Sequence, residues 1–133
     1  LLSYEIERWN EAGTSTVWVR VPQIDRLSST DYIWVYYGNS TAPAAQNAAG
    51  VWSSGQEAVL HLTSTPLADT SGNAYSLSET ATASANGKIS SGRLFDGSDS
   101  SLKFSTSATD LDNIFNGGGS ISVWIRPTGW GEN

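Results

Sequence analysis

The sequence of 133 residues contains no cysteine, no methionine and only one histidine. Without cysteine the chain forms no disulfide bond and has no thiolate with which to bind a metal. A natural translation start supplies a methionine, so we expect this chain to be a fragment or a processed piece of a longer protein. These absences leave carboxylate, amide, hydroxyl and aromatic side chains as the groups that could carry a function.

Charged side chains are also scarce. Only 15% of the residues are charged, the formal net charge is −6, and the chain has two lysines and five arginines. Nucleic acids and anionic membrane surfaces attract clustered cations, so neither is an expected partner. No apolar run approaches the roughly 18 residues that a membrane-spanning helix needs, and we therefore expect no membrane insertion.

What the chain does contain is serine, threonine and aromatic residues in strand-like patterns. Apolar residues alternate with polar ones in several stretches, and others are apolar throughout. The predicted strands lie at 2–9, 16–22, 31–37, 57–63, 87–97, 101–104 and 120–127. Turn-forming pairs such as Asn86-Gly87, which suits a type I′ hairpin, separate them. We predict an all-β fold, an antiparallel β-sandwich that is incomplete at both ends.

The first stretch predicts which face of a strand is buried. Leu2, Tyr4 and Ile6 alternate with Glu5 and Glu7, so we expect the two glutamates to face solvent. Residues two apart on a strand are separated by roughly 6.6 Å. Because glycosidase carboxylates work near this separation, a catalytic pair is the alternative.

The single histidine, His61, lies in the apolar stretch AVLHL. One histidine is sufficient for a Ser-His-Asp system. No G-x-S-x-G nucleophile motif accompanies it, however. We expect His61 to be a buried strand residue whose hydrogen bonds are satisfied within the protein.

The alanine-rich stretch 41–50 divides the chain. It has no apolar face, so it predicts a linker or a single loose helical turn. Three predicted strands precede it, which is few for an independent domain. We predict three parts: a β-domain portion at 1–42, a linker at 43–50 and a second β-domain portion at 51–133.

Short sequence blocks in both portions resemble known families. WVRVP and VYYGN, in 1–42, resemble the C-terminal part of an uncharacterised β-domain of large secreted, surface and phage structural proteins. DTSGN, RLFDG and SISVWIRP, in 51–133, resemble the first half of a laminin-G-like domain of the concanavalin A-like lectin/glucanase superfamily. The resemblance implies a jelly-roll sandwich, an extracellular or virion location and recognition of glycans.

The stretch DTSGN has two interpretations. Asp69, Ser71 and Asn73 place oxygen atoms at alternate positions as in a calcium loop, but Gly72 stands at the fourth position and not the sixth, so this is no EF-hand. The other interpretation is an Asx turn, in which Asp69 accepts from the N–H of Ser71 and Gly72 has positive φ. The laminin-G-like resemblance implies a possible structural calcium, with Asp69, Asn73, Asp96 and Asp99 as its ligands; no other cofactor is expected.

Six tryptophans and five tyrosines raise the question of sugar stacking. The possible aromatic platforms are Trp9, Trp18, Trp34, Tyr36, Trp52 and Trp130. Trp34 and Trp124 lie in strongly apolar stretches, where we expect core packing. Trp18 and Trp130 are the candidate ligand-binding residues.

These observations favour a non-catalytic adhesion or recognition module of a large extracellular or virion-associated protein, with a glycan as the ligand. The alternative is a purely structural β-sandwich whose sheet edges are completed by neighbouring protein subunits. A fragment of a glycoside hydrolase is a third, less favoured interpretation. In each case the chain is expected to be part of a larger chain or assembly.

Overall fold

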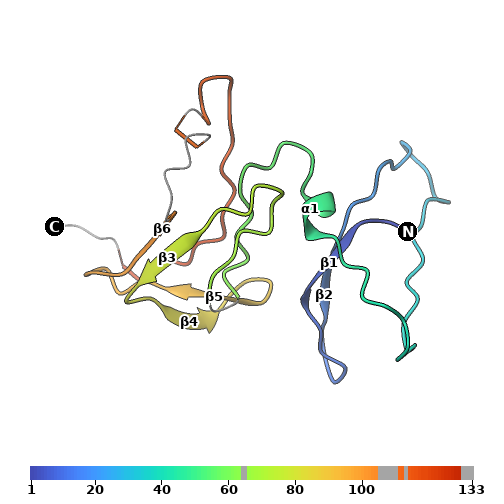
Figure 1. Ribbon diagram of the computed structural model, residues 1–133, viewed down its shortest axis with the longest axis horizontal. Coiled ribbons are helices and arrows are strands. Elements are labelled where there is room, and N and C mark those ends of the chain that lie inside the picture. Colours follow the sequence, from blue (N-terminus) through green and yellow to red (C-terminus); the bar gives the residue numbers. More distant parts are fainter. Residues whose placement is uncertain (64–65, 105–110, 113, 130–133) are drawn as a thin grey trace.

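The computed structural model describes residues 1–63, 66–104, 111–112 and 114–129. In this part of the chain six short strands and one helical turn are present (Figure 1). They are β1 (Tyr4–Arg8), β2 (Thr16–Val19), α1 (Ala48–Val51), β3 (Leu77–Thr80), β4 (Ala83–Asn86), β5 (Ser91–Leu94) and β6 (Ser101–Phe104). All three strand pairs are antiparallel, so the prediction of an all-β antiparallel fold is confirmed.

β1 and β2 form a hairpin in which Glu5 lies opposite Trp18 and Ile6 opposite Val17. The second edge of β1 is covered by the segment before α1 and not by another strand. The N–H of Asn47 donates to the carbonyl of Tyr4 at 2.9 Å, and the N–H of Ile6 donates to Gln46 Oε1 at 2.7 Å. Covering an edge in this way blocks edge-to-edge pairing with other chains.

α1 is a single turn, as the alanine-rich stretch predicts. The side chain of Asn47 caps it by accepting from the N–H of Gly50 at 2.9 Å. Gly50 packs tightly against the start of the chain, where a Cβ atom at this position would lie 2.6 Å from Ser3 Oγ. A larger residue at position 50 would therefore have to displace the side chains of Ser3 and Asn47.

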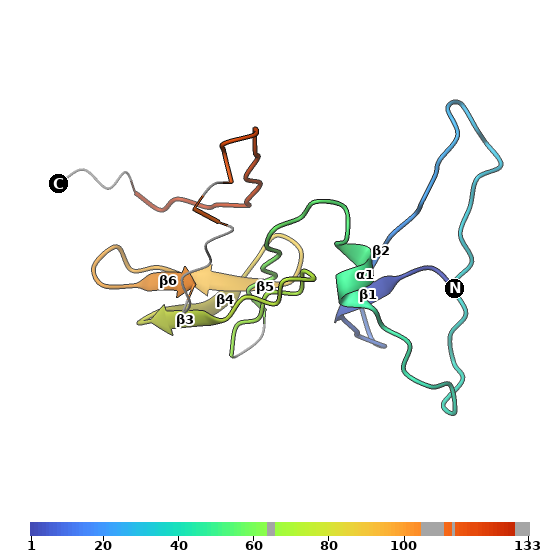
Figure 2. The same ribbon diagram turned by 45° about the horizontal axis from the view of Figure 1, so that its top comes forward.

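The other four strands form two ribbons, β3 with β6 and β4 with β5. The ribbons lie next to each other (Figure 2) and are joined by an ion pair between Arg93 Nε and Glu79 Oε2 at 3.3 Å. The predicted hairpin is present as β4–β5, but its turn is displaced from the Asn86-Gly87 pair. The N–H of Gly87 bonds to the carbonyl of Ser90 at 2.8 Å, so the chain reverses at 88–89.

Buried residues are few among those described: Leu67, Glu5, Asp69 and Ser71. Three of the four are polar. Burial of polar groups is tolerated only where their hydrogen bonds are satisfied. The most enclosed parts of the protein are therefore held by hydrogen bonds as much as by apolar packing.

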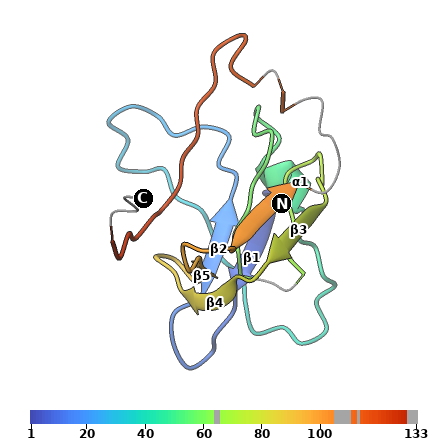
Figure 3. The same cartoon turned by 90° about the vertical axis from the view of Figure 1, so that its left-hand side faces the viewer.

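Three predicted strands are not formed. The stretches 31–37 and 120–127 are extended without pairing, and 57–63 makes only the isolated bridge between Leu60 and Asp69. Trp34 is 74% exposed and Trp124 is 72% exposed, so the expectation that they lie in the core is wrong. A segment that is apolar on both faces needs covering on both. Lys88 Nζ lies 5.7 Å from the ring centroid of Trp124, but the large apolar side chains of both stretches stay exposed. Viewed along the long axis, the chain around both stretches runs outside the strands (Figure 3).

Candidate functional site

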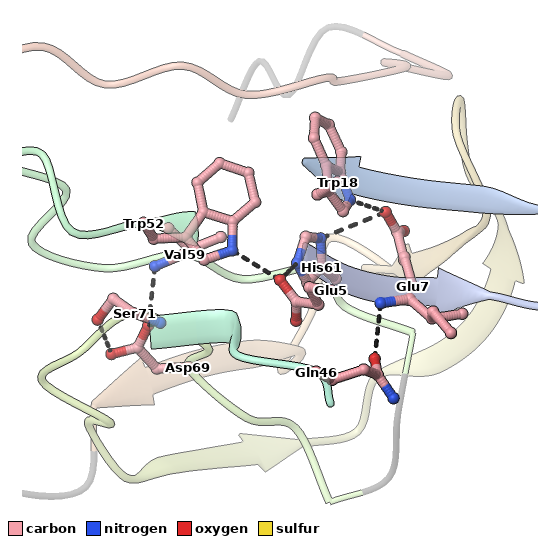
Figure 4. Close-up of polar contacts among 10 residues, drawn as sticks. Glu5, Glu7, Trp18, Gln46, Trp52, Val59, His61, Asp69 and Ser71 are labelled. Atoms are coloured by element: carbon pink, nitrogen blue, oxygen red, sulfur yellow. Dashed lines mark hydrogen bonds and ion pairs between the residues drawn. The ribbon is translucent and has the colours of Figure 1, made fainter. Parts of the chain in front are cut away.

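A cluster of polar and aromatic side chains lies where the β1–β2 hairpin meets the chain that follows α1 (Figure 4). β1 supplies Glu5 and Glu7, β2 supplies Trp18, and the chain after α1 supplies Trp52 and His61. We call these five residues the Glu–His–Trp cluster. Alternation along β1 directs both glutamates to one face, and the register of the hairpin sets Trp18 opposite Glu5.

The imidazole of His61 lies between the two carboxylates. His61 Nε2 is 3.2 Å from Glu5 Oε2, and His61 Nδ1 is 3.4 Å from Glu7 Oε2. Each of these oxygens also accepts from an indole N–H: Trp52 Nε1 donates to Glu5 and Trp18 Nε1 to Glu7, both at 2.6 Å. The contact with Glu5 is a hydrogen bond, and both contacts are ion pairs only when the imidazole is protonated on both nitrogens.

The expectation that Glu5 and Glu7 face solvent is wrong. Their side chains are only 10% and 4% exposed, and that of His61 is 12% exposed. Indole and imidazole donors satisfy the carboxylates, which makes their burial tolerable. The apolar face of the hairpin is the more open one, since Val17 is 40% exposed. His61 is enclosed and hydrogen-bonded as expected, although it lies outside the strands.

The polar atoms of the cluster form their contacts with one another. His61 contacts a carboxylate through each ring nitrogen, and no hydroxyl group among the described residues contacts it. The ring also occupies the space between the two carboxylates, where a glycosidase would hold the sugar. Within the described ranges, no group of three His, Cys, Asp or Glu side chains could hold a metal ion. The arrangement is that of a brace between two chain segments.

The outer side of this brace is aromatic. The rings of Trp18 and Trp52 lie 5.2 Å apart at 57°, and Trp18 stacks on His61 at 5.8 Å and 28°. Beside the two indoles is an open hollow of about 340 Å³. It is lined by Trp18, Val19, Arg20, Val21, Pro22, Val51, Trp52, Ser54 and Gln56. Arg20 Nη1 donates to Ser53 Oγ at its margin.

The structure describes one of the two predicted ligand-binding residues, Trp18, and not the other, Trp130. Trp18 lies on the hollow. Trp130 falls outside the described residues. Trp52, one of the wider set of platforms, also lines the hollow, whereas Trp9 is an exposed residue that does not line it. The sequence holds no local signal that would join Trp18 to Trp52, because their contact depends on how the chain after α1 packs on the hairpin.

The Asp69 loop has the geometry of the predicted Asx turn. Asp69 Oδ1 accepts from the N–H groups of Val59 at 2.8 Å and Ser71 at 2.9 Å. Oδ2 accepts from Ser71 Oγ at 2.8 Å and from the N–H of Tyr75 at 3.0 Å. Burial opposes ionisation of Asp69, but these hydrogen bonds outweigh it and lower the pKa of the carboxyl group.

Two details of this loop differ from expectation or extend it. Gly72 does not have the predicted positive φ; Ala74 has it instead, at 50°. Asn73 turns its amide nitrogen toward Glu57, donating to the carbonyl at 3.0 Å and to Oε2 at 3.1 Å. The loop is thus tied to the chain 14 to 16 residues before it.

The Asp96 loop is a second, more exposed turn of the same type. Asp96 Oδ1 accepts from the N–H of Ser98 at 3.0 Å and from Ser100 Oγ at 2.8 Å. These bonds lower the pKa of Asp96 to about 2. Asp99 lies exposed in the same loop. The four predicted calcium ligands are thus divided between two loops, Asp69 and Asn73 in one and Asp96 and Asp99 in the other, and the calcium site stays a prediction.

Comparison with known proteins places the chain in a family. A family model described as a domain of unknown function (DUF2341) matches residues 1–107. The chain belongs to this family. No curated protein and no solved structure matches the chain.

The DUF2341 match covers every strand of the structure and all five residues of the Glu–His–Trp cluster. It includes the WVRVP and VYYGN blocks, which carry the predicted resemblance to an uncharacterised β-domain. It also runs through the predicted linker at 43–50 into the second portion. The laminin-G-like resemblance of that portion stays a prediction, as do the domain bounds.

Proposed function

We propose that this DUF2341 chain is a non-catalytic recognition module that binds a glycan in the hollow beside Trp18 and Trp52. The observation that carries the proposal is the pair of indole rings, 5.2 Å apart, at the side of an open space of about 340 Å³. Ligand sites are typically concave, mostly apolar and about 300 to 1,000 Å³ in volume, with a few polar groups that orient the ligand.

The residues around the hollow suit a sugar. Aromatic rings present flat apolar faces to the C–H side of a pyranose. Arg20, Ser54 and Gln56 supply donors and acceptors for hydroxyl groups at the rim. The hydrogen bonds from the two indoles to Glu5 and Glu7 fix the ring orientations before any ligand arrives. Such preorganisation reduces the entropy lost on binding.

The proposed setting is extracellular, on a secreted, cell-surface or virion-associated protein. The resemblance of both portions to such proteins supports it, and so does the acidic, lysine-poor composition, which disfavours nucleic acid as a partner. Among the described residues no helix has the length and hydropathy to span a bilayer.

The test is a glycan array probed with the 133-residue chain, followed by titration of each hit. We expect affinity in the micromolar range or better. Arg20→Ala and Gln56→Ala each remove one rim hydrogen bond, worth about 1 kcal/mol, so binding should weaken by about fivefold. Trp9→Ala is the matched control, since Trp9 is exposed and does not line the hollow. A silent array, or equal losses in all three variants, would contradict the proposal.

A thermal melt with and without calcium tests the predicted calcium site. If Asp69, Asn73, Asp96 and Asp99 bind calcium in the native state, added calcium must raise the melting temperature and a chelator must lower it. We expect glycan binding to persist with chelator, because the hollow lies on the β1–β2 hairpin and none of the four residues lines it.

A second candidate function is a purely structural one, in which neighbouring chains complete open sheets. The observation that favours it is the pair of unpaired apolar stretches at 31–37 and 120–127. A hydrolase fragment is disfavoured because the carboxylates of Glu5 and Glu7 are already hydrogen-bonded to Trp52 and Trp18. Release of reducing sugar by this chain would overturn that judgement.

A further inference from the structure

Two extended segments, 31–37 and 120–126, are exposed and have no backbone hydrogen-bond partner among the described residues. Both have strand-type sequences, DYIWVYY and SISVWIR. Their large apolar side chains are all exposed: Tyr32, Ile33, Trp34, Val35, Tyr36, Tyr37, Ile121, Val123, Trp124 and Ile125. Contiguous apolar surface of this kind on a soluble protein marks an interaction site.

The two segments complement each other in one antiparallel register. With Asp31 opposite Arg126, the aromatic residues of one segment meet β-branched residues of the other on one face. These pairs are Tyr32 with Ile125, Trp34 with Val123 and Tyr36 with Ile121. On the other face Ile33 meets Trp124, Val35 meets Ser122 and Tyr37 meets Ser120. Aromatic–β-branched and opposite-charge pairs are among those that stabilise antiparallel sheets.

The register is specific. A shift by one residue in either direction separates Asp31 from Arg126 and turns the side chains of one segment to the opposite face. The charge pair therefore selects, among nearby alignments, the one that matches aromatic with β-branched residues. Apart from the N–H of Asp31, which donates to Ser28 Oγ at 3.1 Å, the backbone N–H and C=O groups of both segments have no partner among the described residues, and these are the groups that strand addition uses.

Within one copy the segments lie apart. In Figures 1 and 2, 31–37 lies on the side of β1 and β2, and 120–126 lies on the side of β3 to β6. We propose that a second copy of this chain supplies the missing partner, so that 31–37 of one copy pairs antiparallel with 120–126 of the next. When two copies make both contacts with each other, the assembly closes as a symmetric dimer; when each contact is made with a different copy, it grows head to tail. It is independent of the glycan proposal, because neither segment lines the hollow.

Disulfide trapping tests the register directly, because the natural chain has no cysteine. Val35→Cys and Ser122→Cys are made in separate chains, which are mixed and oxidised. We expect a covalent heterodimer, because the two positions face each other across the proposed pair. Ser122→Cys mixed with Thr14→Cys, an exposed position in the β1–β2 turn, is the control and should stay unlinked. Equal linking in both mixtures, or none in either, overturns the proposal.

A charge exchange provides a second test that needs no disulfide. By light scattering, the mean mass of the unmodified chain should rise with concentration. Asp31→Arg or Arg126→Asp alone should weaken association by about two- to fivefold, the effect of one cross-strand charge pair. The double variant should restore it. A chain that stays monomeric, singles that match the parent, or a double variant as weak as the singles would overturn the proposal, and circular dichroism confirms that each variant is folded.

Discussion

The Glu–His–Trp cluster and the Asp69 loop both bury carboxylates, but they satisfy them in different ways. Asp69 is held mostly by backbone N–H groups, all within ten residues of it. Glu5 is held by side chains of Trp52 and His61, which are 47 and 56 residues away. The loop therefore depends on local chain geometry, whereas the cluster depends on the packing of one chain segment on another.

The largest effect is expected from His61→Ala. This change leaves Glu5 and Glu7 buried without the ring between them, and breaking a buried ionic arrangement typically costs about 3–5 kcal/mol. Urea denaturation measures the change in the free energy of unfolding. His61→Gln, which retains one amide donor, should lose less. Unchanged stability in His61→Ala would mean that the cluster does not join the two segments.

Asp69→Ala should come next, with a loss of about 3 kcal/mol. It removes the acceptor of three backbone N–H groups and one hydroxyl, and each buried donor left unsatisfied is costly. The loss should be measured by the same denaturation experiment. Asp99→Ala, an exposed neighbour in the other loop, is the control and should unfold like the parent. Equal stability of the two variants would mean that the hydrogen bonds of Asp69 contribute little to the free energy of unfolding.

Trp52→Phe removes one hydrogen-bond donor from the Glu–His–Trp cluster and changes the side-chain volume little. Glu5 keeps its contact with His61 but loses the indole N–H at 2.6 Å, and we expect a loss of about 1–2 kcal/mol. Trp9→Phe is the matched control, because Trp9 is exposed. The glycan proposal adds a second readout, since the hollow loses the orientation of one ring. A loss as large as that of His61→Ala would show that ring packing, and not the hydrogen bond, stabilises the cluster.

The smallest expected effect is a difference between the Asp69 and Asp96 loops in how stability depends on pH. Both carboxyl groups have lowered pKa values in the folded protein, so each adds stability above the unfolded pKa of about 3.9 that is lost as pH falls below it. Asp69→Asn should flatten the fall in stability between about pH 4 and pH 2. Asp96→Asn should change it much less, because solvent screens an exposed group. Equal slopes in the two variants would remove the distinction between the loops.

What could be predicted from the sequence follows the same division between local and distant contacts. The alternation in 2–9 and 16–22 located β1 and β2, and DTSGN predicted the bond from the N–H of Ser71 to Asp69, because both depend on neighbouring residues. The burial of Glu5 and Glu7 was not predictable in this way. It requires knowing that Trp18 lies across the hairpin and that His61 packs against it, and neither fact is in the local pattern.

The wrong strand predictions have a related cause. Segments 31–37 and 57–63 have strong strand-type composition, yet composition says nothing about whether a partner with unpaired backbone is at hand. Among the described residues 31–37 finds none, and 57–63 finds only the bridge to Asp69. Strand propensity therefore indicates that a segment can join a sheet, but it does not indicate whether a partner strand lies beside it.

The covered second edge of β1 also bears on the order of folding. The β1–β2 hairpin is local and can form in about 1–10 μs. The bond from Ile6 to Gln46 spans 40 residues, so the intervening chain must first close a long loop against its own entropy. We therefore expect the hairpin to form first, and the amide hydrogen of Ile6 to gain protection from solvent exchange only after the chain around Gln46 has docked on β1.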